Sequence, residues 1–189
     1  CDPSKNSFYI YNSDSEDGTV DGTCQGDIPT YGSNPPVQSV TFLNKSLDAF
    51  VLYNNSAFGG FPATSDPRID HQYHLLMNAT WLDGTPMTKG GSGYDPQSSN
   101  IVHHLFPDNP NDDTGWSMHT AGIEAGDRRT IGVHNSQLSP NSVLNFTVAF
   151  SYHNHPDKNF LDNVNYALNR IDTLQIHFDA GKIGCQPEL

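Results

Sequence analysis

Apolar and polar residues alternate along several short segments of this 189-residue chain, as expected for β-strands that have one covered face. The alternation is clearest in residues 143–153, and residues 37–54 predict a hairpin of two strands. A single short helix is predicted within residues 156–170, where apolar residues approach helical spacing. The same pattern predicts further strands at residues 7–11, 72–82, 100–106, 116–121, 129–134 and 171–178.

The composition favours turns over helices. Asp and Asn each occur 18 times, with 16 Gly and 13 Pro, whereas Glu occurs 3 times. The pattern and the composition together predict an all-β protein, an antiparallel β-sandwich or jelly roll with long Asx/Gly/Pro-rich loops and at most one short helix. We expect a turn-rich segment, residues 1–36, to pack on a single β-sandwich domain of residues 37–189.

Strand parity predicts which side chains face the core. In residues 143–153, Phe150 and Tyr152 share the apolar face, so His153 and His155 are expected on the opposite, exposed face. The last predicted strand likewise turns His177 outward. The same reasoning places five histidines on the side away from the core, namely His74, His134, His153, His155 and His177.

Two of these histidines have the spacing of metal ligands. His153 and His155 would stand about 6.5–7 Å apart on one strand face, with His134 or His177 as a candidate third ligand. Neutral imidazole suits Zn²⁺ or Cu²⁺. The alternative is that surface imidazoles in an Asp-rich protein make ordinary polar contacts.

A second pattern has the chemistry of proton abstraction. An imidazole at His177, an amide at Gln175 and a guanidinium at Arg129 could perform β-elimination on a uronic-acid polymer. The net charge of −12 would repel such a polyanion unless the groove were locally basic. An outward face of ordinary strand polar residues is the alternative.

Acidic loops and loop aromatics suggest ligand binding. Asp112 and Asp113 lie beside Trp116, and Tyr94 lies in a Gly-rich loop, so these four residues are candidates for contacting a sugar. The acidic loops at residues 14–21 and 108–113 could also hold a structural Ca²⁺, although neither has the EF-hand pattern. Solvated turns are the alternative explanation.

Charge and apolar run length exclude several classes of protein. With 9 Lys and Arg against 21 acids, the chain lacks the cations that nucleic-acid binding needs. No apolar run approaches the roughly 20 residues of a membrane-spanning helix.

The low Lys content, the abundant Asp and Asn and the few scattered cysteines favour an extracytoplasmic protein. A disulfide between Cys24 and Cys185 is expected, with a Cys1–Cys24 pair as the alternative. A chain that begins at Cys1 suggests either secretory processing or a lipid anchor at the cell surface. Sequons for N-glycosylation occur at Asn44, Asn54, Asn78 and Asn145.

These observations predict a secreted or cell-surface protein that binds a carbohydrate or another extracellular ligand. One alternative is a polysaccharide-active enzyme, a lyase or a metal-dependent enzyme, that uses a His-rich sheet face. The other is a structural subunit of an extracellular assembly that self-associates through Cys1.

Overall fold

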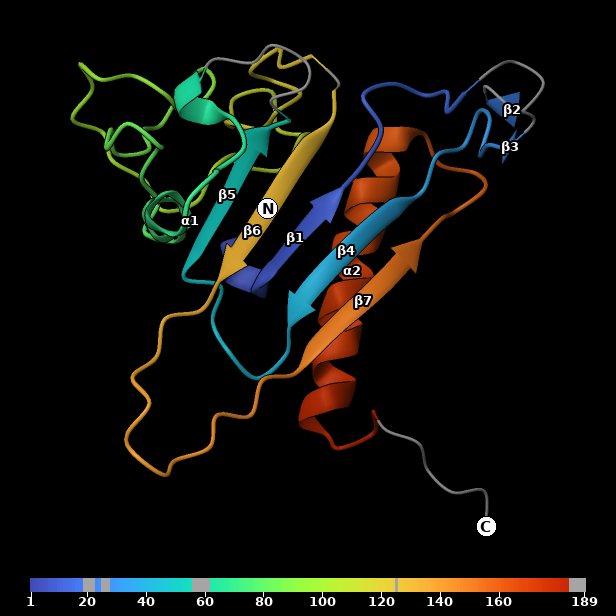
Figure 1. Cartoon of the computed structure of the whole chain (residues 1–189). Helices are drawn as coiled ribbons and strands as arrows, with labels where there is room; N and C mark the ends of the chain where they lie inside the picture. The colour runs from blue at the N-terminus through green and yellow to red at the C-terminus, as the bar shows by residue number, and fades with distance from the viewer. Residues whose placement is uncertain (19–22, 25–27, 56–61, 125, 184–189) are drawn as a thin grey trace. The chain divides into compact units, whose positions relative to one another are not determined.

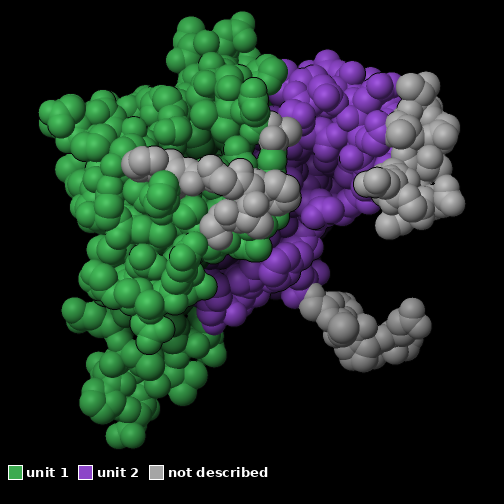
Figure 2. Space-filling model, turned by 45° about the horizontal axis from the view of Figure 1, so that its top comes forward, with its two compact units in different colours: residues 1–8, 45–145 green, residues 9–44, 146–189 purple. Residues whose placement is uncertain are grey.

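The computed structural model describes residues 1–18, 23–24, 28–55, 62–124 and 126–183 (Figure 1). The chain forms two compact units, coloured separately in Figure 2. Unit 1 comprises residues 1–8 and 45–145, and unit 2 comprises residues 9–44 and 146–189. Unit 2 is therefore discontinuous in sequence, a division that differs from the expected one at residue 36.

Unit 2 is built around an antiparallel pair of strands. β4 (Val37–Phe42) pairs with β7 (Val148–His153), so that Val37 lies opposite His153 and Phe42 opposite Val148. β1 (Ser7–Ile10), within which the boundary between the units falls, is the third strand and lies on the other side of β4. β2 (Thr23–Cys24) and β3 (Ile28–Pro29) form a separate antiparallel pair.

A long helix, α2 (Phe160–Asp179), packs on the sheet of unit 2 (Figure 1). Its first turn is capped by Asn159, whose side chain accepts a hydrogen bond from the backbone N–H of Asp162 at 2.8 Å. Its apolar residues recur at helical spacing and therefore form one stripe. The buried cluster against this stripe comprises Val37, Val164, Ala167, Leu168 and Ile171, with Tyr9 and Tyr11 packed against it.

Unit 1 contains an antiparallel pair of its own, β5 (Ala49–Asn54) and β6 (Arg128–Val133). α1 (Asp70–Met77) contacts both strands. Two short 3₁₀ turns, η1 (Pro3–Lys5) and η3 (Pro62–Thr64), complete the described elements of this unit. Its core includes Trp81, whose indole N–H donates to the Gly93 carbonyl at 2.8 Å.

The expectation of antiparallel sheets is confirmed, and a sandwich or jelly roll stays a prediction. The hairpin expected at residues 37–54 is wrong, because β4 pairs with β7 and β5 pairs with β6. Both of its strands exist, at Val37–Phe42 and Ala49–Asn54. Strand partners depend on contacts distant in sequence, which local pattern does not encode.

Four of the predicted strands are absent from the described structure. Residues 72–82 lie largely in α1, and residues 171–178 form the second half of α2, so the expectation of at most one short helix is wrong. Residues 100–106 make only isolated bridges, and residues 116–121 form turns. The β-branched Ile171, Thr173 and Ile176 suggested a strand, but packing of the helical stripe outweighs this weak local preference.

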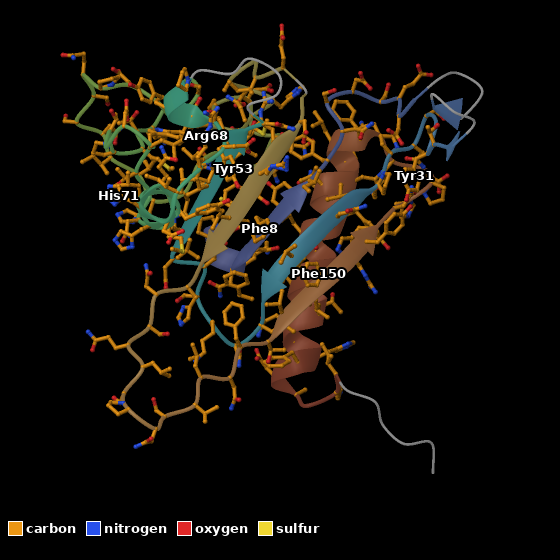
Figure 3. The ribbon with its side chains drawn as sticks, in the orientation of Figure 1. Phe8, Tyr31, Tyr53, Arg68, His71 and Phe150 are labelled. Atoms are coloured by element: carbon orange, nitrogen blue, oxygen red, sulfur yellow. The ribbon has the colours of Figure 1, made fainter. Side chains whose placement is uncertain are left out.

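The prediction of which face of residues 148–153 is buried is also wrong. Phe150, labelled in Figure 3, is 81% exposed, whereas His153 is 8% exposed and belongs to the buried face. Ser39 and Ser151 lie on that buried face, and their hydroxyls are 2.9 Å apart. Small hydroxyl side chains allow a helix to pack close to the sheet, and their mutual hydrogen bond offsets most of the cost of burying them.

Across the described ranges, no helix is long and apolar enough to span a membrane.

Candidate functional site

A groove of about 410 Å³ lies in unit 2, where the end of β7 meets α2. This volume is within the range of small-ligand sites, roughly 300–1,000 Å³. The lining includes two histidines, one arginine and two tyrosines. The lining residues are Ser151, Tyr152, His153, Asn154, Tyr166, Arg170, Thr173, Leu174 and His177.

His153 forms the inner wall of the groove. Its Nε2 lies 3.2 Å from the hydroxyl of Ser39, which in turn contacts the hydroxyl of Ser151. Burial lowers the pKa of His153 below the ordinary value of histidine, and the nearby charge of Arg170 lowers it further. The imidazole is therefore neutral at neutral pH and offers a hydrogen-bonding nitrogen rather than a charge.

The contact between Ser39 and His153 resembles a nucleophile and its base in distance alone. Ser39 is 3% exposed and does not line the groove, so a ligand there would not reach its hydroxyl. In the described ranges no carboxylate hydrogen-bonds to His153 to orient it as a base. The contact accordingly holds the imidazole in place.

The outer wall is one face of α2. Tyr166, Arg170, Thr173 and His177 follow each other at intervals of four, three and four residues, which aligns them along the helix. The Tyr166 ring meets the His155 ring edge-on, with centroids 5.2 Å apart. Within the described part of the chain, no side chain or carbonyl pairs with the side chains of Arg170 or His177.

The expected catalytic set is not assembled in this groove. Gln175 lies within α2, two residues before His177, and its side chain therefore points to a different side of the helix. Its amide donates to the Leu43 carbonyl at 3.0 Å and to Asp179 at 2.9 Å. Arg129 belongs to unit 1, where its Nε donates to Asp66 at 3.3 Å.

The expected metal ligands have other partners. His134 belongs to unit 1 and pairs with Asp48 at 3.1 Å. His155 follows the end of β7, and its Nδ1 accepts the backbone N–H of Asp157 at 3.3 Å. Over the ranges that the structure covers, no group of three His, Cys, Asp or Glu could hold a metal ion. The set His153, His155 and His134 thus has no assembled ligand shell in the described structure.

The loop residues expected to contact a sugar are engaged within unit 1. Trp116 is buried, with its ring 4.9 Å from that of Phe106 and its indole N–H donating to the Gly91 carbonyl. The Tyr94 hydroxyl donates to Asp83 at 2.7 Å. Asp112 accepts the backbone N–H of Thr114 at 3.0 Å in a turn, and the adjacent Asp113 is exposed. These contacts match the alternative of solvated turns.

The sequons differ in accessibility. Asn44, Asn78 and Asn145 are exposed, whereas Asn54 ends β5 and its amide donates to Thr64 at 3.3 Å.

Cys1 is buried, and its thiol donates to the Leu105 carbonyl at 3.4 Å, so it offers no surface for self-association. The expected Cys24–Cys185 disulfide lies outside the described structure, since neither Cys185 nor the side chain of Cys24 is described.

Sequence reasoning identified His153 and His177 but missed Tyr166 and Arg170. The available signal was the helical spacing of residues 166, 170, 173 and 177, which is visible only if the helix continues beyond residue 170. A search against family models, curated proteins and solved structures found no match to the chain.

Proposed function

We propose that this is a secreted or cell-surface protein that binds a carbohydrate in the groove between β7 and α2. The observation that carries the proposal is the placement of the Tyr166 ring, the Arg170 guanidinium and the His177 imidazole along one wall, without intramolecular partners for the last two among the described residues. Such groups are the usual means by which a protein orients a polar ligand in a concave site.

The lining residues suit both kinds of surface that a sugar presents, the apolar face of its ring and its hydroxyl groups. The apolar C–H face of a sugar ring stacks on an aromatic ring, a role open to Tyr166. Sugar hydroxyls need hydrogen-bonding groups, which Asn154, Thr173 and the neutral His153 supply. Asn154 and Thr173 each already donate one hydrogen bond, to Asn34 and Asn169, and this fixes their orientation while leaving acceptor oxygens available.

Binding is favoured over catalysis by the surroundings of His153. A general base for neutral-pH chemistry works best with a pKa near the operating pH, and here burial and Arg170 lower the pKa instead. The hydroxyl closest to His153 belongs to the buried Ser39. The groove therefore holds and orients a ligand.

Substitution of Tyr166 tests the proposal. Calorimetry with the saccharide selected on a glycan array should show that Tyr166→Ala weakens binding by about 5–10-fold, because a ring contact contributes about 1 kcal/mol. Tyr166→Phe should retain most of the affinity because the ring remains. Tyr73→Ala, which removes an exposed tyrosine of α1 in unit 1, is the matched control and should bind as the unsubstituted protein does.

Thermal unfolding of each variant separates a lost contact from a lost fold. A protein that binds no saccharide on the array, or a folded Tyr166→Ala variant that binds as tightly as Tyr73→Ala, would overturn the proposal.

A further inference from the structure

The groove of unit 2 is free of acidic side chains although the chain is strongly acidic. None of its nine lining residues is Asp or Glu, whereas the chain has 21 acids and a net charge of −12. A ligand in the groove therefore meets the positive charge of Arg170 with no carboxylate on the lining to oppose it. The low-dielectric walls of a groove focus the electric field of such a charge.

Arg170 differs from Arg128 and Arg129 in having no partner for its guanidinium within the described structure. The exposed Arg68 also lacks one among the described residues, but of the four arginines only Arg170 is among the residues that line the groove. Arg129 pairs with Asp66 at 3.3 Å, and Arg128 donates to the carbonyls of Glu124 and Asp127. The Arg170 guanidinium has neither a hydrogen bond nor an ion pair in the ranges described. In a chain where acids outnumber Lys and Arg by 21 to 9, an exposed guanidinium without a carboxylate partner is available to pair with a carboxylate of a ligand.

We infer that the ligand is an acidic sugar whose carboxylate pairs with Arg170, an inference that rests on the proposed carbohydrate-binding function. The planar guanidinium presents two parallel N–H groups that match the two oxygens of a carboxylate. One guanidinium also balances one carboxylate charge. A phosphate monoester carries nearly two negative charges at neutral pH and would be incompletely balanced by Arg170.

The remaining lining residues fit the rest of such a ligand. His153 is neutral at neutral pH because burial and Arg170 lower its pKa, so it can serve the sugar hydroxyls without adding charge. Tyr166 lies one helical turn before Arg170 and His177 about two turns after it, on the same face of α2. A sugar whose carboxylate meets Arg170 would then lie along these residues.

The experiment compares acidic disaccharides with their neutral methyl esters, which have the same ring and lack the charge. The probes are disaccharides ending in glucuronate, galacturonate or mannuronate, each paired with its ester and with a sulfated disaccharide. Calorimetry is run on the full chain and on Arg170→Gln and Arg170→Lys. Arg129→Gln is the matched control, because it removes one equal charge from a site in unit 1.

At least one acidic disaccharide should bind about 10-fold tighter than its ester, a preference that Arg170→Gln removes and Arg170→Lys keeps in part. Arg129→Gln should leave the preference unchanged. Equal binding of acid and ester, a preference that survives Arg170→Gln, or equally tight binding of the sulfated disaccharide would overturn the inference. If neutral sugars bind while the acid gains nothing, the carbohydrate function still stands. If no saccharide binds, the proposed function fails and the inference fails with it.

Discussion

At the scale of single residues, His153 is the buried residue of the groove. It ends β7 on the face covered by α2, with Ser39 on one side and Arg170 near it. The neighbouring Phe150 and Tyr152, which alternate with it along the strand, point the other way and are exposed. The neutral form of this imidazole is favoured, because charging it costs desolvation and brings its charge beside that of Arg170.

The lowered pKa of His153 has a consequence for stability. In the unfolded chain His153 titrates at its ordinary pKa, so as the pH falls through that value the unfolded state takes up a proton that the folded state does not. Stability is therefore fully present above the ordinary pKa of histidine and is lost as the pH falls toward the lower folded value. Urea unfolding between about pH 7.5 and pH 5.5 should show a larger loss for the unsubstituted protein than for His153→Gln.

Titration of the His153 ring by NMR gives an independent measurement. Its midpoint should lie below the ordinary value of histidine, and Arg170→Gln should raise it by removing one of the two causes. A midpoint at or above the ordinary value would contradict the burial of this side chain.

At the scale of elements, α2 is held to the sheet by polar as well as apolar contacts. Asn163 is fully buried among the apolar stripe. Its amide donates to the Asn34 side chain and to the Pro35 carbonyl, and its oxygen accepts the backbone N–H of His155 at 3.0 Å. One side chain therefore joins α2 to the segments before β4 and after β7, and it fixes the helix that carries Tyr166 and Arg170.

Replacing Asn163 should destabilise unit 2 strongly. Asn163→Leu keeps a similar volume but leaves the His155 N–H and the Pro35 carbonyl without a partner, at a cost of about 2–3 kcal/mol. Chemical denaturation followed by circular dichroism measures this change. The control, Asn169→Ala on the exposed side of the same helix, should change stability by less than about 0.5 kcal/mol. Equal stability of the two variants would show that the amide network does not hold the helix.

At the scale of the whole molecule, residues 45–145 of unit 1 are an insertion between the two segments of unit 2. The ends of the insertion meet at one point, because the Leu43 N–H donates to the Thr147 carbonyl at 3.0 Å and Asn44 accepts the Thr147 N–H at 2.8 Å. These contacts extend the ladder of β4 and β7 by one further position. Unit 2 therefore has its strands, its helix and its apolar cluster without residues 45–145.

This arrangement predicts that residues 45–145 can be replaced by a two-residue Asn-Gly turn. The turn suits a two-residue hairpin connection and would join Asn44 to Phe146. The shortened protein should retain the circular dichroism of a 20-residue helix and slow amide exchange in α2. The same protein with Ile171→Asp, which places a charge in the apolar cluster, should lose both signals. A shortened protein without helical signal would contradict the independence of unit 2.

The amino-acid sequence by itself determines the charge balance of the chain and the positions of several strands. The excess of acids over Lys and Arg follows from composition, and residues 7–10, 37–42, 49–54 and 128–133 form strands where short-range pattern predicts them. Local residue preference is sufficient to predict these strands, because each segment needs only an extended backbone and one buried face.

Only the tertiary structure decided which strands pair, which face of β7 is covered, and that residues 171–178 continue α2. Alternation along a strand shows that its two faces differ, but the face that is buried depends on the element that packs against it. The site shares this dependence, because Tyr166, Arg170 and His177 come to one wall only on a helix, and His153 joins them only when that helix covers β7.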